Sequence, residues 1–89
     1  MLGNINERFD MILAKTEEEW GARASAFLKA EMKKADVTYA ELAKRLKKHG
    51  LKETEAGITM KLKRGTFAAT FFLACLAALE LEGIGLEEL

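Results

Sequence analysis

Residues 37–79 read VTYAELAKRLKKHGLKETEAGITMKLKRGTFAATFFLACLAAL, and this stretch decides the fold. Thr38 followed by Glu41 has the form of a capping box, in which a Thr and a Glu side chain close the first turn of a helix. Gly50 suits the left-handed backbone conformation that commonly follows the last turn of a helix. The pattern predicts a helix over residues 39–49.

A shorter helix is expected next, over residues 53–64. It opens near Glu53 or Thr54, buries Ile58 and Leu62 at positions i and i+4, and stops at Gly65. The last helix is expected over residues 67–81. Thr66 can cap that helix, and its first 13 residues are apolar apart from Thr70, which predicts a helix buried on all sides.

Two helices are expected before this stretch. Ile5, Phe9, Ile12 and Leu13 form one apolar stripe, which predicts a short N-terminal helix. Thr16 followed by three glutamates predicts the start of a second helix, which runs to about residue 35 and places Trp20 in the core. Residues 82–89 indicate neither a helix nor a strand.

The composition supports one all-α domain of about five helices over residues 1–89. Apolar residues make up 49% of the chain, charged residues 31%, and proline is absent, as suits a folded helical protein. Residues 1–15 are expected to form an accessory helix, residues 16–81 the core and residues 82–89 a tail.

Side chains for catalysis are scarce. Cys75 is the only cysteine and His49 the only histidine, so a disulfide, a zinc cluster or a Cys/His nucleophile pair cannot readily be assembled. We therefore expect no enzyme activity, no metal and no cofactor. The first residues lack the layout of a secretory signal, and the longest nearly apolar run is 13 residues, whereas a bilayer span needs about 20. A cytoplasmic protein without a membrane partner is expected.

The net charge is zero, but the charges are segregated along the chain. Residues 29–64 carry a balance of +6, against −2 for residues 1–28 and −4 for residues 65–89. A basic central segment is typical of a surface that meets nucleic acid, although a basic run such as KRLKK is more often a solvated helix face.

The order of elements predicts a helix-turn-helix motif: a capped helix, a glycine turn, a short helix with a basic end, an Arg-Gly-Thr corner and a buried helix. With Ile58 and Leu62 as anchors, a helical wheel directs Glu53, Ala56 and Met60 outward together with Lys63. The helix over residues 53–64 is therefore expected to enter the major groove of double-stranded DNA.

Each candidate DNA contact has a chemical role. Thr59 can hydrogen-bond a base, Ala56 or Met60 can touch a thymine methyl group, and the basic residues can neutralise phosphates. The amide groups that open the helix at Thr38, with the Tyr39 hydroxyl, can hold a further phosphate. The predicted contacts are Thr38, Tyr39, Lys52, Ala56, Thr59, Met60, Lys63 and Arg64.

VTYAELAKRL, Ile58, Leu62, RGTF and LACLAAL together resemble the lambda-repressor/Cro (XRE-type) superfamily in order and patterning. The resemblance covers about half the chain and implies a lambda-repressor-like bundle that binds DNA. The spacing from Ala43 to Ile58 is five residues longer than in the compact motif, so the register of individual contacts differs. Within this class, Trp20, the residues RA and FLKAE that follow it, VTYAELA and KLKRGTF resemble a group of short bacterial proteins described as a domain of unknown function, over roughly residues 17–80.

Two further expectations concern partners. The apolar helix over residues 67–79 needs a cover, which either the N-terminal helix or a second copy of the chain can supply, and a homodimer would set two recognition helices about 34 Å apart. The alternative function is a helical protein-interaction module that keeps the fold without binding DNA. Zero net charge and the acids Glu53 and Glu55 favour that alternative.

Overall fold

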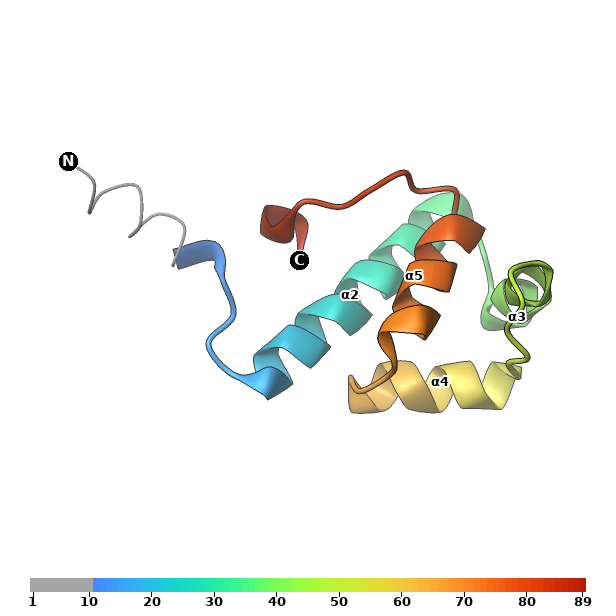
Figure 1. The fold of residues 1–89 in the computed structure, drawn as a ribbon, viewed down its shortest axis with the longest axis horizontal. Coiled ribbons are helices and arrows are strands. Elements are labelled where there is room, and N and C mark those ends of the chain that lie inside the picture. The colour runs from blue at the N-terminus through green and yellow to red at the C-terminus, as the bar shows by residue number, and fades with distance from the viewer. Residues whose placement is uncertain (1–10) are drawn as a thin grey trace.

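The computed structural model of the chain describes residues 11–89, which form four α-helices and no strand. In chain order these are α2 (Glu17–Ala35), α3 (Tyr39–Lys48), α4 (Glu55–Arg64) and α5 (Ala69–Ala78), followed by a 3-10 turn, η1 (Leu86–Glu88) (Figure 1). The all-α prediction is confirmed for this part of the chain. Met11 and Ile12 are helical, and residues 5–10 of the predicted N-terminal helix lie outside the described residues.

Three of the helices begin at a threonine whose hydroxyl accepts a hydrogen bond from the backbone N–H three residues later. The pairs are Thr16 with Glu19 (3.1 Å), Thr38 with Glu41 (3.1 Å) and Thr54 with Gly57 (2.9 Å). Each bond satisfies one of the N–H groups that a first helical turn leaves without a backbone partner. The predicted starts of α2 and α3 are therefore confirmed, whereas α4 begins at Glu55, two residues after the predicted Glu53, with Thr54 as its cap. The predicted left-handed conformation of Gly50 (φ 87°) is confirmed, and Gly65, where α4 was predicted to stop, adopts it as well (φ 72°).

The predicted start of α5 at Thr66 and Phe67 was wrong. Residues 66–68 are not helical, and α5 begins at Ala69 after Ala68, which supplies no side-chain cap. The left-handed turn at Gly65 leads the chain out of α4, and the Phe67 ring packs on Phe71, with the ring centroids 5.3 Å apart. Phe67 thus anchors the connection to α5 and does not form part of the helix.

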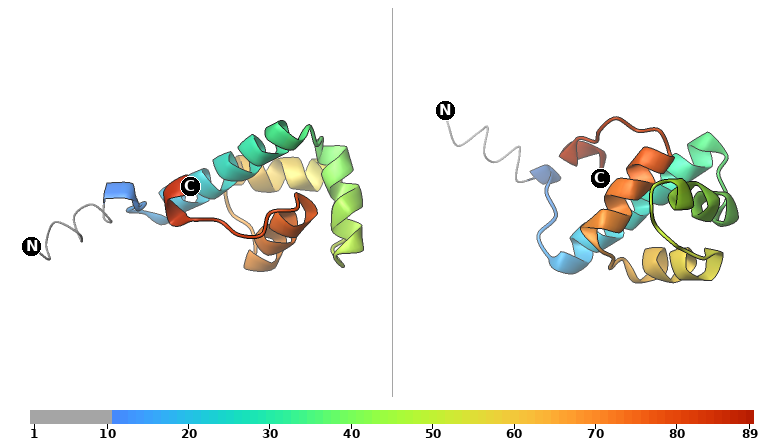
Figure 2. Two further views of the ribbon diagram at one scale, coloured as in Figure 1. Left: turned by 90° about the horizontal axis from the view of Figure 1, so that it is seen from above. Right: turned by 45° about the vertical axis from the view of Figure 1, so that its right-hand side comes forward.

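The core lies where the four helices meet. α3 packs on both α4 and α5, and α2 packs on α4, as the views in Figures 1 and 2 also show. The largest fully buried side chains are Leu28, Leu42, Leu46, Ile58, Leu62, Phe71 and Cys75. Trp20, predicted to lie in the core, is only half-buried. It lies near the start of α2, and the buried residues of that helix begin at Ser25. Ile58 and Leu62 are confirmed as the anchors of α4.

α2 and α4 cross at a contact between two glycines. A Cβ atom on Gly21 would overlap the carbonyl oxygen of Gly65, and a Cβ on Gly65 would lie 3.1 Å from the carbonyl carbon of Gly21. No side chain fits between the two main chains at this point. The crossing fixes the corner after α4 against the first half of α2.

The residues after α5 turn back along α2, where η1 approaches its outer face (Figure 1). Ile84 and Leu89 pack against the core, and the Glu88 carboxylate accepts a hydrogen bond from the Gly85 N–H (2.6 Å). The sequence did not predict a structure for this tail, because Gly83 and Gly85 interrupt the spacing of its apolar residues.

The prediction that α5 is buried on all sides was also wrong. Leu73 is 62% exposed, and Ala69, Thr70 and Ala77 on the same side of the helix are exposed as well. α3 covers only the opposite side, which carries Phe71, Cys75 and Ala78. α5 therefore presents a narrow apolar stripe on the surface of residues 11–89.

Candidate nucleic-acid interface

The outward side of α4 is a continuous exposed surface. Ile58 and Leu62 are 0% and 2% exposed, which turns Ala56, Thr59 and Met60 away from the core. These three residues, with Thr54 and Glu55, line a shallow hollow. Because no side chain there is longer than Met60, a flat partner can approach the helix closely.

Lys63 and Arg64 extend this surface into the last turn of α4. Both are exposed, and both line a second depression with Lys29 of α2. Lys29 also lines a third depression, which Lys33 and residues 37–39 at the start of α3 complete. Lys29 therefore links the depression at the end of α4 to the one at the start of α3, and Lys63 follows Thr59 by one helical turn on α4. Together these three depressions are the candidate surface.

Three members of this surface were not predicted from the sequence: Lys29, Lys33 and Thr54. Lys29 and Lys33 are spaced i, i+4 on α2, so they share a face, but the sequence did not indicate that this face adjoins the start of α3. The exposed Lys52 lies in the connection before α4, and the Tyr39 ring is half-buried against the core. Seven of the eight predicted contacts line one of the three depressions, and Lys52 lines none of them.

Three threonine hydroxyl groups of this surface each have one hydrogen-bonding function already occupied. Thr59 Oγ1 donates to the Glu55 carbonyl (2.9 Å), so its lone pairs are the groups left for a ligand. The hydroxyls of Thr38 and Thr54 accept from backbone N–H groups, so their protons are left for a ligand. Thr59 is therefore suited to a donor, and the two cap residues are suited to an acceptor such as a phosphate oxygen.

Glu53, predicted to point outward from α4, does not belong to this surface. It precedes the helix, its side chain is only 13% exposed, and it pairs with Lys61 (3.1 Å). The Lys61 Nζ atom in turn lies 5.6 Å from the centre of the Phe71 ring. The wheel misplaced Glu53 because the helix begins only at Glu55.

The same cluster reaches the single cysteine. Burial, with the nearby Glu53 carboxylate as the second cause, raises the pKa of the Cys75 thiol from 9.0 to about 12. A thiol in this environment stays protonated and unreactive near neutral pH. Cys75 acts as a small apolar core residue, as its sequence context predicted.

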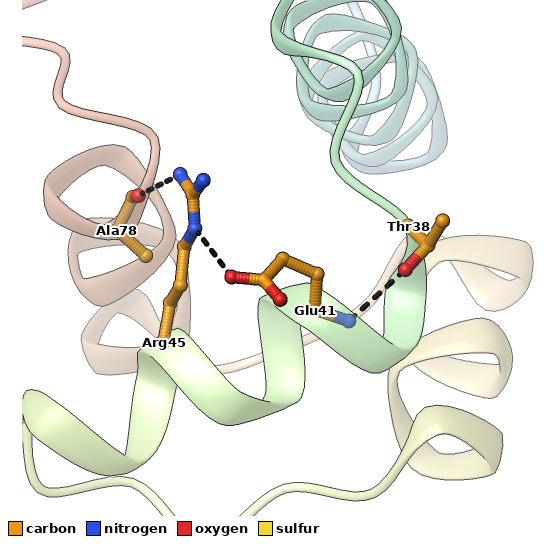
Figure 3. Close-up of polar contacts among 4 residues, drawn as sticks. All are labelled: Thr38, Glu41, Arg45 and Ala78. Atoms are coloured by element: carbon orange, nitrogen blue, oxygen red, sulfur yellow. Dashed lines mark hydrogen bonds and ion pairs between the residues drawn. The ribbon is translucent and has the colours of Figure 1, made fainter.

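The basic run from Lys44 to Lys48 lies elsewhere, and Arg45 has a structural role. Arg45 Nη1 donates to the Ala78 carbonyl (3.0 Å) at the end of α5, and Nε donates to Glu41 (3.2 Å) (Figure 3). Within the run KRLKK, which was expected to be a solvated helix face, Arg45 is partly buried instead, because the C-terminal turn of α5 leaves a carbonyl group within its reach. The pairing also removes one positive charge from the basic run.

The described residues bring no three His, Cys, Asp or Glu side chains together as a metal site would require. Between residues 11 and 89, no helix combines the length and the apolarity needed to cross a bilayer.

Residues 11–89 form a unit of four α-helices with exposed cations beside the end of α4. The chain belongs to the family described as "Domain of unknown function (DUF6471)", whose model matches residues 20–84. This confirms the resemblance to a domain of unknown function. Comparisons with the curated proteins and with the solved structures found no match.

Proposed function

We propose that the chain is a sequence-specific DNA-binding protein of the lambda-repressor/Cro (XRE-type) helix-turn-helix class, and that it regulates transcription. α3 and α4 would form the motif, with α4 in the major groove. The observation that carries the proposal is the exposed side of α4, which is slender and neutral in its middle and continues into the cations Lys63, Arg64 and Lys29. A recognition helix needs this combination, because base edges demand close approach and phosphates demand positive charge.

The base contacts would come from the middle of α4. Thr59 offers lone pairs, which suit the amino groups of adenine or cytosine in the major groove. Ala56 and Met60 offer apolar contacts, which suit the methyl group of thymine. Met60 is 53% exposed and can adapt its flexible side chain to the base it meets.

The phosphate contacts would lie on both sides of α4. The start of α3, where Thr38 and Tyr39 sit beside Lys29 and Lys33, supplies backbone N–H groups and the positive end of the helix dipole. Lys63 and Arg64 supply the corresponding charges at the end of α4, and Lys52 adds one before it. The surface thus has cations at several of the places where a duplex backbone would pass.

The rival proposal, a protein-interaction module without DNA binding, loses part of its support. One of the two acids that favoured it, Glu53, is paired with Lys61 and turned away from the surface of α4. Glu55 remains exposed, at the first turn of the helix. We further propose that the protein is not an enzyme and that it acts in the cytoplasm.

We extend the proposal to a homodimer formed through the exposed stripe of α5 around Leu73, with the N-terminal helix as the second contributor. A two-fold dimer would let two copies of α4 read two half-sites. In Figure 1 the described end of the N-terminal segment, residues 11–15, lies at the start of α2, apart from α5.

A selection of genomic fragments by the purified chain, read at two salt concentrations, tests the proposal. We expect Lys63→Ala, Arg64→Ala and Lys29→Ala each to weaken binding to the selected fragment and to lower its salt dependence by about one released counterion. Thr59→Ala should cost about 1 kcal/mol and relax the preference at one base pair.

The matched controls are Lys44→Ala and Lys48→Ala, which remove exposed lysines of α3 that lie outside the surface. Equal losses in the controls and in the three surface variants would reduce the proposal to non-specific attraction. Recovery of one stable protein partner, with no fragment selected at either salt concentration, would favour the interaction module.

A further inference from the structure

A cleft of about 500 Å³ lies between α2 and the segment formed by the last turn of α4 and the corner after it. Its walls come from Ser25 and Lys29 on α2 and from Lys63, Arg64, Gly65 and Thr66 on the other side, with Glu17 and Glu18 at one end. The glycine crossing lies one helical turn before Ser25 and brings the two walls together. The volume falls within the range of sites that bind small molecules, about 300–1,000 Å³.

Ser25 is the unexplained residue of this cleft. It is 4% exposed, and its Oγ atom has no hydrogen-bond partner. A helical serine usually bonds the carbonyl group four residues earlier, but here the Gly21 carbonyl is packed against the corner at Gly65. A buried hydroxyl group without a hydrogen-bond partner destabilises the fold, and this one belongs to a residue that lines the cleft, where a bound group could complete it.

The charges around the cleft sum to +1, because the carboxylates of Glu17 and Glu18 stand against three cations, and they favour an anionic group beside the cations. Lys29, Lys63 and Arg64 line it, and none of the three forms an ion pair within residues 11–89. The hydroxyl of Ser25 can donate to an anion that also meets these cations. The exposed Thr66, next to Gly65 in the corner after α4, belongs to the same wall.

We propose that this cleft binds the carboxylate or phosphate group of a small metabolite, held by Ser25, Lys29 and the cations that end α4. Lys63 and Arg64 are also phosphate contacts in the proposed function, so the metabolite competes with DNA for them. That regulatory effect rests on the proposed function, whereas occupation of the cleft does not. The site would make the chain a regulator that an anionic metabolite releases from DNA.

The first experiment titrates the full chain with inorganic phosphate and, separately, with citrate at constant ionic strength, and follows the amide resonances by NMR. We expect saturable shifts at Ser25, Lys29, Gly65 and Thr66. Ser25→Ala should lower the affinity about tenfold or more, because it removes a hydrogen bond to a charged group. The same variant should keep or raise Tm, since it removes an unsatisfied buried hydroxyl group.

The matched control exchanges one of two neighbouring lysines of α2. Lys29→Gln should lower the affinity for phosphate, and Lys33→Gln, which lies outside the cleft, should leave it unchanged. Unsaturable shifts, equal affinity in the wild type and Ser25→Ala, or a Tm several degrees lower in Ser25→Ala would each overturn the proposal.

The second experiment separates the metabolite from the DNA backbone as the source of the anion. Saturating phosphate or citrate should weaken the binding of a selected duplex more in the wild type than in Ser25→Ala at matched ionic strength. Anion binding without any duplex binding would refute the proposed function and leave the site standing. Resonance shifts at Ser25 that only a duplex produces would assign the cleft to a DNA phosphate and would overturn the proposal that it binds a metabolite.

Discussion

The α carbon of Gly21 faces the carbonyl oxygen of Gly65 with no room for a side chain between them. This contact sets α2 across the end of α4 and so positions the last turn of α4, which carries Lys63 and Arg64. Helix packing usually depends on interdigitated side chains, whereas here the main chains touch. The proposed DNA surface thus depends on two residues without side chains.

Gly21→Ala should destabilise the protein by about 2 kcal/mol or more, because the overlap exceeds the gain of about 1 kcal/mol in helix propensity. Urea unfolding followed by circular dichroism measures the change. Gly83→Ala is the control, since a Cβ atom there has no neighbour within 4 Å, and it should change the free energy of unfolding by less than about 0.5 kcal/mol. A stabilised Gly21→Ala variant would contradict the crossing.

Arg45→Met should destabilise the protein by about 1 kcal/mol while leaving duplex binding unchanged. The substitution removes the bonds to the Ala78 carbonyl and to Glu41, and solvent reduces their worth because the Arg45 side chain is 31% exposed. Lys47→Met is the control within the same basic run and should be nearly neutral. Weaker DNA binding by Arg45→Met, at unchanged stability, would show that this basic run belongs to the interface.

Stability should fall as the pH rises above about 9, and Cys75 should contribute to the fall. The pKa of Cys75 is about 12 in the folded protein and 9.0 for a free thiol, so above pH 9 the unfolded chain releases a proton that the folded chain retains. The loss between pH 8 and pH 10 should be about 1 kcal/mol smaller in Cys75→Ala. Equal losses would show that Cys75 ionises as readily in the folded protein as in the unfolded chain.

Leu73→Lys should shift the chain from dimer to monomer in sedimentation velocity without lowering its stability as a monomer. Leu73 is 62% exposed, so a lysine there has no core contact to break, but it would place charges at the proposed interface. Leu86→Lys, at an exposed apolar residue of η1, is the matched control and should leave the dimer intact. A wild-type chain that is monomeric at micromolar concentration would contradict the proposed homodimer.

The parts of this fold that follow from local chemistry could be predicted from the sequence. Thr16, Thr38 and Thr54 begin helices because their hydroxyl groups bond the first turn, and Gly50 and Gly65 end helices because they adopt positive φ. The surface of α4 followed from the two anchors, Ile58 and Leu62.

The parts that depend on contacts between distant residues could not be predicted. Arg45 meets Ala78 across 33 positions of the chain, and Lys61 turns Glu53 away from α4. Phe67 packs on Phe71 outside α5, although its sequence context suits a helix equally well. Lys29 belongs to the candidate site because α2 lies beside both the end of α4 and the start of α3, an arrangement that the sequence does not reveal.

The burial of Cys75 has a practical consequence for anyone who studies this chain. A thiol that is fully buried and protonated does not compete for alkylating reagents in the folded state. A cysteine introduced at an exposed position would therefore be the only one to carry a fluorophore or a cross-linker, without removal of the native residue. Placed at Met60, such a probe would report directly which molecule α4 meets.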